Sequence, residues 1–254
     1  RMSLTRSYKT PSLYQLVALY RPSLGDNSWT QPDRTGNPDL KPELATGIDI
    51  AFERYLAQGG LLSANVFRRN ISNLIRSTTS YNSSTGRYVS LPTNVGDAIT
   101  QGLELEAKFR LDQWFAGALP VDVRANASFF HSRVLDVPGP GNRLDQQPDM
   151  TANLGGDYRL RGLPLTLGGN VNWNPAYDTR RTEQQWVYQG AKRVTDVYGL
   201  WKLPPSAGLR LTVSNLTPLD YITGSTFRSG GQYESATTTA RNWRNIQLRL
   251  EMKI

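Results

Sequence analysis

The stretch NIQLRLEMKI, residues 245–254, alternates apolar and polar side chains without a break. One set of positions is entirely apolar: Ile246, Leu248, Leu250, Met252 and Ile254. The positions between them are entirely polar: Gln247, Arg249, Glu251 and Lys253. Successive side chains of a β-strand point to opposite faces, so this period of two predicts a strand with one apolar and one polar face.

The same alternation recurs along the chain. We expect about ten strands, separated by stretches rich in turn residues. Their approximate positions are residues 1–9, 48–53, 61–76, 103–109, 121–129, 150–158, 165–173, 195–201, 209–213 and 245–254. The sequence therefore predicts an all-β, antiparallel fold.

The connections between these strands alternate in length. Short ones occupy residues 54–60, 110–120, 159–164 and 202–208. Long ones, rich in Gly, Ser, Thr, Asn and Pro, occupy residues 10–45, 77–94, 130–147, 174–192 and 217–241. Short turns at one end and long loops at the other are typical of an up-and-down transmembrane β-barrel, with short periplasmic turns and long extracellular loops.

Aromatic residues support a membrane barrel independently, because Trp and Tyr collect at both interfaces of such barrels. One group lies near the short turns: Phe52, Tyr55, Phe109, Trp114, Tyr158 and Trp201. A second lies near the long loops: Phe129, Trp173, Tyr177 and Trp243. The alternative is that these are ordinary strand residues, since aromatic side chains favour strands in any β protein.

Composition narrows the possible functions of the chain. It has 254 residues, 38% of them hydrophobic, no cysteine and a single histidine, His131. These counts exclude disulfides, thiolate metal sites and any site built from two histidines. The net charge is +8, but no basic stretch is interleaved with aromatics on one strand, so we expect no nucleic-acid partner. We also expect no cofactor.

Five segments in order resemble the C-terminal half of the barrel of TonB-dependent outer-membrane receptors. They are SYKTPSLYQL (7–16), GNPDLKPELATGIDIAFE (36–53), FRRNISNLI (67–75), NVGDAITQGLELEAKF (94–109) and LTVSNLTPLDY (211–221). In that family the stretch NPDLKPE marks the return from an extracellular loop into a strand. Pro38 and Pro42 have no backbone N–H to donate to a sheet, so we expect strand pairing to resume from Gly47.

The resemblance implies a receptor in the bacterial outer membrane that takes up a scarce ligand, most simply a ferric siderophore. It implies contact with outer-membrane lipid and lipopolysaccharide, and coupling to a TonB-type energy transducer through an N-terminal plug region. Barrels of this kind have about 22 strands and a plugged lumen. We therefore expect residues 1–254 to be the C-terminal portion of the barrel, without the plug and the first strands, and to form an open curved sheet or a partnered assembly.

Two other function classes remain open from the residues alone. The first is an enzyme built as a complete ten-stranded outer-membrane barrel. It would need His131 as its base with an acidic partner such as Asp136, and it would require a closed barrel. The second is a soluble carbohydrate-binding β domain.

Ligand contacts are expected in the long loops, where side chains vary without disturbing the strands. One connection combines positive charge with flat apolar surface, as an anionic chelate would need: Arg180, Arg181, Trp186 and Tyr188. Aromatic residues of the neighbouring loops complete the predicted binding set: Tyr81, Tyr88, Phe227 and Tyr233. Exposed loop residues with no ligand role explain the same pattern.

Overall fold

The computed structural model describes residues 1–56, 59–204 and 206–252. Parts of three sequence predictions lie outside the described residues. These parts are positions 57–58 of the first short connection, position 205 of the last short connection, and the final two residues of the C-terminal strand.

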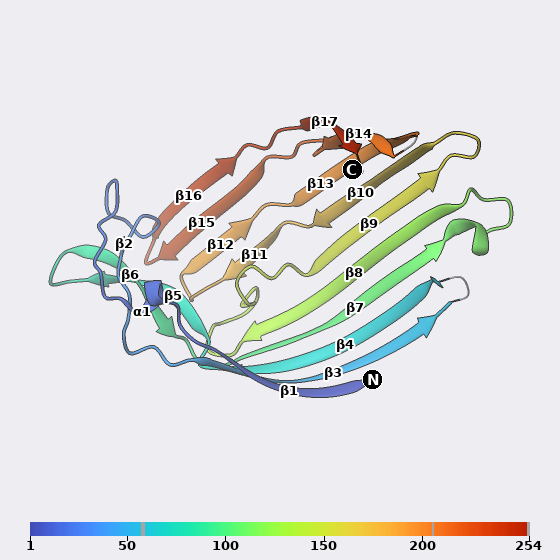
Figure 1. Cartoon of the computed structure of the whole chain (residues 1–254). Coiled ribbons are helices and arrows are strands. Elements are labelled where there is room, and N and C mark those ends of the chain that lie inside the picture. Colours follow the sequence, from blue (N-terminus) through green and yellow to red (C-terminus); the bar gives the residue numbers. More distant parts are fainter. Residues whose placement is uncertain (57–58, 205, 253–254) are drawn as a thin grey trace.

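Ten strands form a single curved antiparallel sheet, and they follow one another in chain order (Figure 1). The first five are β1 (Met2–Lys9), β3 (Glu43–Tyr55), β4 (Leu61–Ser72), β7 (Ala98–Arg110) and β8 (Val121–Val134). The next five are β9 (Met150–Arg159), β10 (Leu165–Asn174), β13 (Lys192–Leu203), β14 (Ala207–Ser214) and β17 (Asn245–Met252). The prediction of ten antiparallel strands with short turns at one end is confirmed.

The sheet is open, as expected for part of a wide barrel. It begins at β1 and ends at β17, and these two edge strands do not pair with each other. Strand β3 starts at Glu43, directly after Pro42, where Glu43 pairs with Lys9. The expectation that pairing resumes only from Gly47 was therefore wrong, because one residue after the proline is enough to restore a free backbone N–H.

Three of the five long connections are hairpins rather than irregular loops, which the sequence did not reveal. Strands β5 (Ile75–Asn82) and β6 (Arg87–Asn94) form a hairpin, and the short β2 (Asp33–Arg34) pairs with β6. A four-stranded sheet joins two further hairpins: β11 (Tyr177–Arg180) with β12 (Gln185–Gln189), and β15 (Tyr221–Ser229) with β16 (Gln232–Ala240). A one-turn helix, α1 (Leu13–Leu16), and a 3-10 turn, η2 (Leu111–Gln113), complete the described elements.

The two faces of the ten-stranded sheet differ in chemistry, as the alternation predicted. We call the face that carries Leu105, Leu167 and Leu248 the apolar face, and its large side chains are exposed. On the polar face, ion pairs join neighbouring strands, including Arg69 with Asp49 and Arg210 with Glu251. In a membrane barrel the apolar face is the one that meets lipid.

Burial is concentrated at the long-loop end of the sheet. Leu74, Ala98, Val134 and Val137 form the buried hydrophobic cluster, with Ile71, Val95 and Leu144 packed against it. Ala98 and Val134 lie on the polar face, so the segment after β8 folds over that face. Among the described residues, no helix has the length and apolar character needed to cross a membrane.

Candidate ligand-binding site in the long loops

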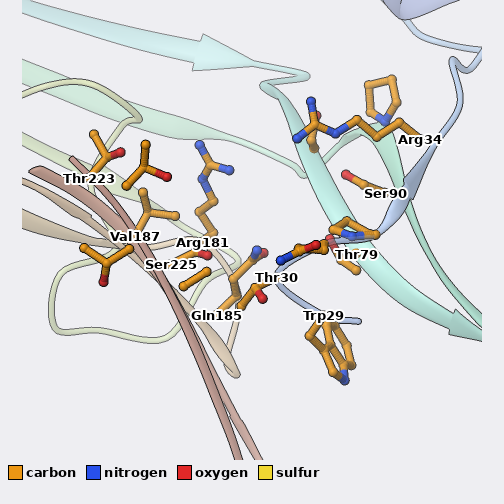
Figure 2. Close-up of a pocket in the computed structure, with 18 of the residues that line it drawn as sticks. Trp29, Thr30, Arg34, Thr79, Ser90, Arg181, Gln185, Val187, Thr223 and Ser225 are labelled. Atoms are coloured by element: carbon orange, nitrogen blue, oxygen red, sulfur yellow. The ribbon is translucent and has the colours of Figure 1, made fainter. Parts of the chain in front are cut away.

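A cavity of about 750 Å³ lies among the hairpins of the long connections (Figure 2). Its lining is largely polar and comes from the segment between β1 and β3, from the β5–β6 hairpin and from the four-stranded loop sheet. The residues labelled in Figure 2 show this mixture: Trp29, Thr30, Arg34, Thr79, Ser90, Arg181, Gln185, Val187, Thr223 and Ser225. The site therefore depends on chain segments that are far apart in the sequence.

A buried carboxylate fixes the first wall of the cavity. Asp33 is fully buried and accepts hydrogen bonds from Arg87 Nε at 2.5 Å and Nη2 at 2.8 Å. It also accepts from the Tyr20 hydroxyl and from the Ser23 backbone N–H. The Arg87 guanidinium, helped by these donors, holds the pKa of Asp33 well below its usual range. The carboxylate thus stays charged and ties residues 20–34 to the β5–β6 hairpin.

A second carboxylate joins this wall to the opposite side of the loop assembly. Glu234 of β16 accepts from the backbone N–H groups of Trp29 at 3.2 Å and Thr30 at 2.9 Å, and from the hydroxyls of Ser28 and Thr30. Burial raises the pKa of Glu234, but the hydrogen bonds outweigh it, so the pKa lies below its ordinary value. The Trp29 ring stacks on Phe227 with centroids 3.8 Å apart. Residues 28–30, which lie between β1 and β3, are therefore attached to the β15–β16 hairpin.

A buried arginine joins three loops beside the cavity. Arg76 donates to the backbone carbonyls of Arg143 at 2.7 Å, Arg181 at 3.2 Å and Arg180 at 3.4 Å. Its Nη2 also lies 3.2 Å from Asp145 Oδ1. Burial lowers the pKa of Arg76, whereas the charge of Asp145 opposes that shift. Because only 1% of the Arg76 side chain is exposed, this junction depends on one charged group with many partners.

The cavity carries positive charge and unused hydrogen-bonding capacity. Arg34 and Arg181 approach it from different sides in Figure 2. Arg181 Nη2 lies 3.4 Å from Asp145 Oδ2, a carboxylate that it shares with Arg76. Among the described residues, Arg181 Nε and Gln185 Oε1 are buried polar atoms without a hydrogen-bond partner. Two guanidinium groups with hydroxyl and amide neighbours can bind a polar, anionic ligand.

Of the eight residues proposed for ligand contact, Arg181 lines this cavity. Arg180 instead donates to the backbone carbonyls of Gly139 at 2.8 Å and Glu183 at 2.9 Å. Its guanidinium also lies over the Trp186 ring, 5.3 Å from the centroid. These contacts give Arg180 and Trp186 a clear structural role in joining two loops, and their role in ligand binding stays a prediction.

The other proposed residues lie around the loop assembly rather than in its cavity. Tyr81 and Tyr88 form a ring pair with centroids 5.0 Å apart, and Tyr88 also contacts Trp29. Phe227 is buried beneath Trp29, while Tyr233 is exposed and lies under Arg228. Tyr188, on β12, is partly exposed. Ligand contact by these five aromatic residues also stays a prediction.

The sequence reasoning missed the polar lining itself. Thr79, Gln185 and Ser225 are common residue types in segments without apolar alternation, so they gave no signal. Gln185 and Ser225 come together because β12 pairs with β15, which places Val187 opposite Ser225, whereas Thr79 is on β5 of the three-stranded sheet. That register is a long-range property of the folded loops.

His131 shows no arrangement for catalysis. It lies exposed on the apolar face of β8, whereas the Asp136 carboxylate lies against Gly96. Within residues 1–56, 59–204 and 206–252, no hydrogen bond links these two side chains, and no group of three His, Cys, Asp or Glu could hold a metal ion. The open sheet also differs from the closed ten-stranded barrel that the enzyme alternative required.

Comparison with known proteins decides the family. The profile of the family described as TonB dependent receptor-like, beta-barrel matches residues 1–216. The chain belongs to this family. Its members are outer-membrane β-barrels that act as receptors and transporters, which places the chain in the bacterial outer membrane and removes the soluble carbohydrate-binding alternative.

Three of the similar proteins are named as receptors for siderophores or their ferric complexes. The chain is 27% identical over 223 residues to the ferric-pyoverdine 358 receptor of Pseudomonas putida, covering 82% of this chain and 25% of that protein. A mutant of the ferric enterobactin receptor PfeA from Pseudomonas aeruginosa matches with a TM-score of 0.58 and 21% identity, over 86% of this chain and 32% of PfeA. The siderophore receptor PirA from Acinetobacter baumannii gives 0.57 and 18%, over 86% and 34%. The chain thus spans about a quarter to a third of the length of these relatives.

Proposed function

We propose that residues 1–254 form the C-terminal part of the barrel of an outer-membrane receptor that takes up a ferric siderophore. The polar cavity with Arg34 and Arg181 in its lining is the observation that carries this proposal. A ferric siderophore is often an anionic chelate with many oxygen atoms, and guanidinium groups with hydroxyl donors bind such surfaces. The relatives named for ferric-pyoverdine and ferric enterobactin support the same class of ligand.

The iron would be recognised through its chelator rather than directly. The chain offers one histidine and no cysteine, and the described residues hold no cluster of metal-ligating side chains. The protein's part in uptake is therefore to bind and orient the chelate at the loops. No covalent step is required.

Transport belongs to the whole receptor. We assign the plug and the remaining strands to other parts of the polypeptide, since the matched relatives are three to four times as long as the segment they share with this chain. A TonB-type transducer would act on the plug and supply the energy for ligand release into the periplasm. Deleting the transducer should stop uptake of the chelate while leaving its binding at the cell surface intact.

The direct test changes the charge of the cavity in the full-length receptor. Arg34→Gln with Arg181→Gln removes both guanidinium groups. Arg54→Gln with Arg161→Gln serves as the control, because these two exposed arginines lie at the short-turn end, away from the cavity. Uptake and binding of iron-55 ferric enterobactin and ferric pyoverdine are measured alongside surface assembly. Loss of two charge-assisted contacts should weaken binding of the cognate chelate about a hundredfold.

The control should bind as wild type does. Normal assembly of the double variant with undiminished binding of the chelate that wild type accepts would remove the cavity from ligand recognition.

A further inference from the structure

One carboxylate beside the cavity has two guanidinium partners of unequal exposure. Asp145 Oδ1 lies 3.2 Å from Arg76 Nη2, and Asp145 Oδ2 lies 3.4 Å from Arg181 Nη2. Only 1% of the Arg76 side chain is exposed, compared with 28% for Arg181. Water can therefore compensate the charge of Arg181 but hardly that of Arg76, so Asp145 matters most to the buried partner.

The contact between Asp145 and Arg76 is one of charge rather than of a directed hydrogen bond. Among the described residues, Asp145 Oδ1 is a buried atom without a hydrogen-bond partner, and so is Arg181 Nε. A carboxylate held by charge alone shifts toward one guanidinium group when the other finds a different anion. The unpartnered Arg181 Nε leaves that arginine with a donor for such an anion.

Arg181 also acts on Arg76 directly. Burial lowers the pKa of Arg76, the charge of Asp145 opposes that shift, and the charge of Arg181 adds to it. The two guanidinium groups therefore repel one another across the carboxylate that they share. An anion that neutralises Arg181 would remove this repulsion and leave Asp145 to Arg76. Both changes strengthen the contacts of Arg76.

The contacts of Arg76 hold a segment that lies outside the cavity. Arg76 Nη2 donates to the Arg143 carbonyl at 2.7 Å. The Leu144 N–H, next in the chain, donates to Ser132 Oγ of β8 at 2.9 Å. In the described part of the chain, none of residues 140–147 lines the cavity. This segment thus connects the Arg76 junction to the polar face of the sheet without being part of the cavity wall.

We propose that Asp145 makes the Arg76 junction sensitive to the charge of the bound ligand. An anionic group against Arg181 takes over its charge, Asp145 turns to Arg76, and Arg76 then holds residues 140–147 more tightly. A neutral group in the same place has no such effect. Asp145 is thus a positioning residue that acts through two arginines. The inference rests on the proposed function for its anionic ligand, whereas the charge balance is a property of the loops without any ligand.

The first test needs no ligand, because Arg181→Gln removes the charge as a bound anion would. Hydrogen exchange of residues 140–147 is measured in the full-length receptor. Exchange should be about fivefold slower in Arg181→Gln than in wild type. Arg181→Lys, which keeps the charge, should exchange as wild type does. A purely structural role for Arg181 predicts the opposite sign, since its loss would then loosen the loops.

The neighbouring arginine supplies the matched control. Arg180 donates to the backbone carbonyls of Gly139 and Glu183, so Arg180→Gln removes contacts that join two loops. Exchange of residues 140–147 should therefore accelerate in this variant. Equal effects of the same sign at positions 180 and 181 would overturn the proposal.

The slowing should also require Asp145. In an Asp145→Asn background, Arg181→Gln should slow exchange by less than about twofold, because no carboxylate remains to pass to Arg76. Retention of the full effect in that background would contradict the role of Asp145. If the Asn variants assemble poorly, the sign of the Arg181→Gln effect still decides the proposal.

The second test adds inorganic phosphate, with sodium chloride at the same ionic strength as the reference. Phosphate should slow exchange of residues 140–147 in wild type and leave Arg181→Gln unchanged. The proposal fails if Arg181→Gln accelerates exchange or leaves it as in wild type, or if phosphate does no more than chloride. Failure of the proposed function would appear elsewhere, as undiminished binding of the ferric siderophore by the Arg34→Gln with Arg181→Gln variant.

Discussion

The ten-stranded sheet and the loop assembly are both antiparallel β-structure, yet they are held together differently. In the sheet, each strand pairs with its chain neighbours and both faces remain largely exposed, so stability is spread over many similar contacts. In the loops, a few buried or half-buried charged groups join segments that are distant in sequence, such as Ser28 and Glu234, 206 residues apart. Single substitutions should therefore open the loops while leaving the sheet intact.

The largest effect is expected at Arg76. Arg76→Met removes a buried cation that joins three loop segments. It leaves three backbone carbonyls without this donor and takes from Asp145 one of its two arginine partners. Breaking a buried ion pair costs about 3–5 kcal/mol, and the free energy needed to open the loops should fall by this amount. Hydrogen exchange of residues 140–147 and 177–189 should accelerate strongly, with β3 and β4 unchanged. Equal acceleration in β3 and β4 would show that sheet and loops unfold together.

Glu234 should give the next largest effect. Glu234→Gln weakens the attachment of residues 28–30 by about 2 kcal/mol, because hydrogen bonds to a charged acceptor become neutral ones. The folded pKa of Glu234 lies below its ordinary 4.5. The attachment is thus fully stable above that value and is lost as pH falls through the lowered pKa. A fluorescence titration of Trp29 in the receptor between pH 6 and about 2 measures this, and the Gln variant should lack the transition.

The sheet and the loops also differ in how much of their structure the sequence predicts. The ten strands can be predicted because alternation is a local signal. Leu248 and Arg249 are assigned to opposite faces of their strand without any knowledge of the rest of the fold. The loop hairpins cannot be predicted in this way, because QYESATTTA of β16 is polar on both faces and acquires its strand form by pairing with β15. The cavity could not be predicted from the sequence for the same reason, since Thr30 and Ser225 come together only after the loops have paired.

Within the sheet, the largest local effect is expected at Gly168. A Cβ there would lie 2.3 Å from Asp157 Oδ1 and 2.4 Å from the Tyr198 ring, which are hydrogen-bonded across the glycine. Gly168→Ala should cost about 1–2 kcal/mol by forcing these side chains apart. Urea unfolding of the receptor in lipid vesicles measures the cost, with Gly162→Asn in the exposed short turn as the control. No loss at Gly168 would contradict this packing.

The smallest effect is expected at Arg69, the counterpart of Arg76. Its pair with Asp49 is partly exposed on the polar face, and such pairs contribute about 0.2–1 kcal/mol. Arg69→Met should therefore lower the free energy of unfolding by less than Arg76→Met lowers the free energy of loop opening. Similar losses of free energy for the two variants would contradict the view that the sheet is stabilised by many small contacts and the loops by a few strong ones.

The central claim is that the loops of this chain enclose the ligand. Hydrogen exchange of the full-length receptor, with and without the ferric siderophore that it takes up, tests this directly. We expect ligand-dependent protection of residues 28–35, 181–187 and 223–226, which line the cavity from separate connections, and no change at the short turn 159–164. Protection confined to segments outside the cavity would contradict the account.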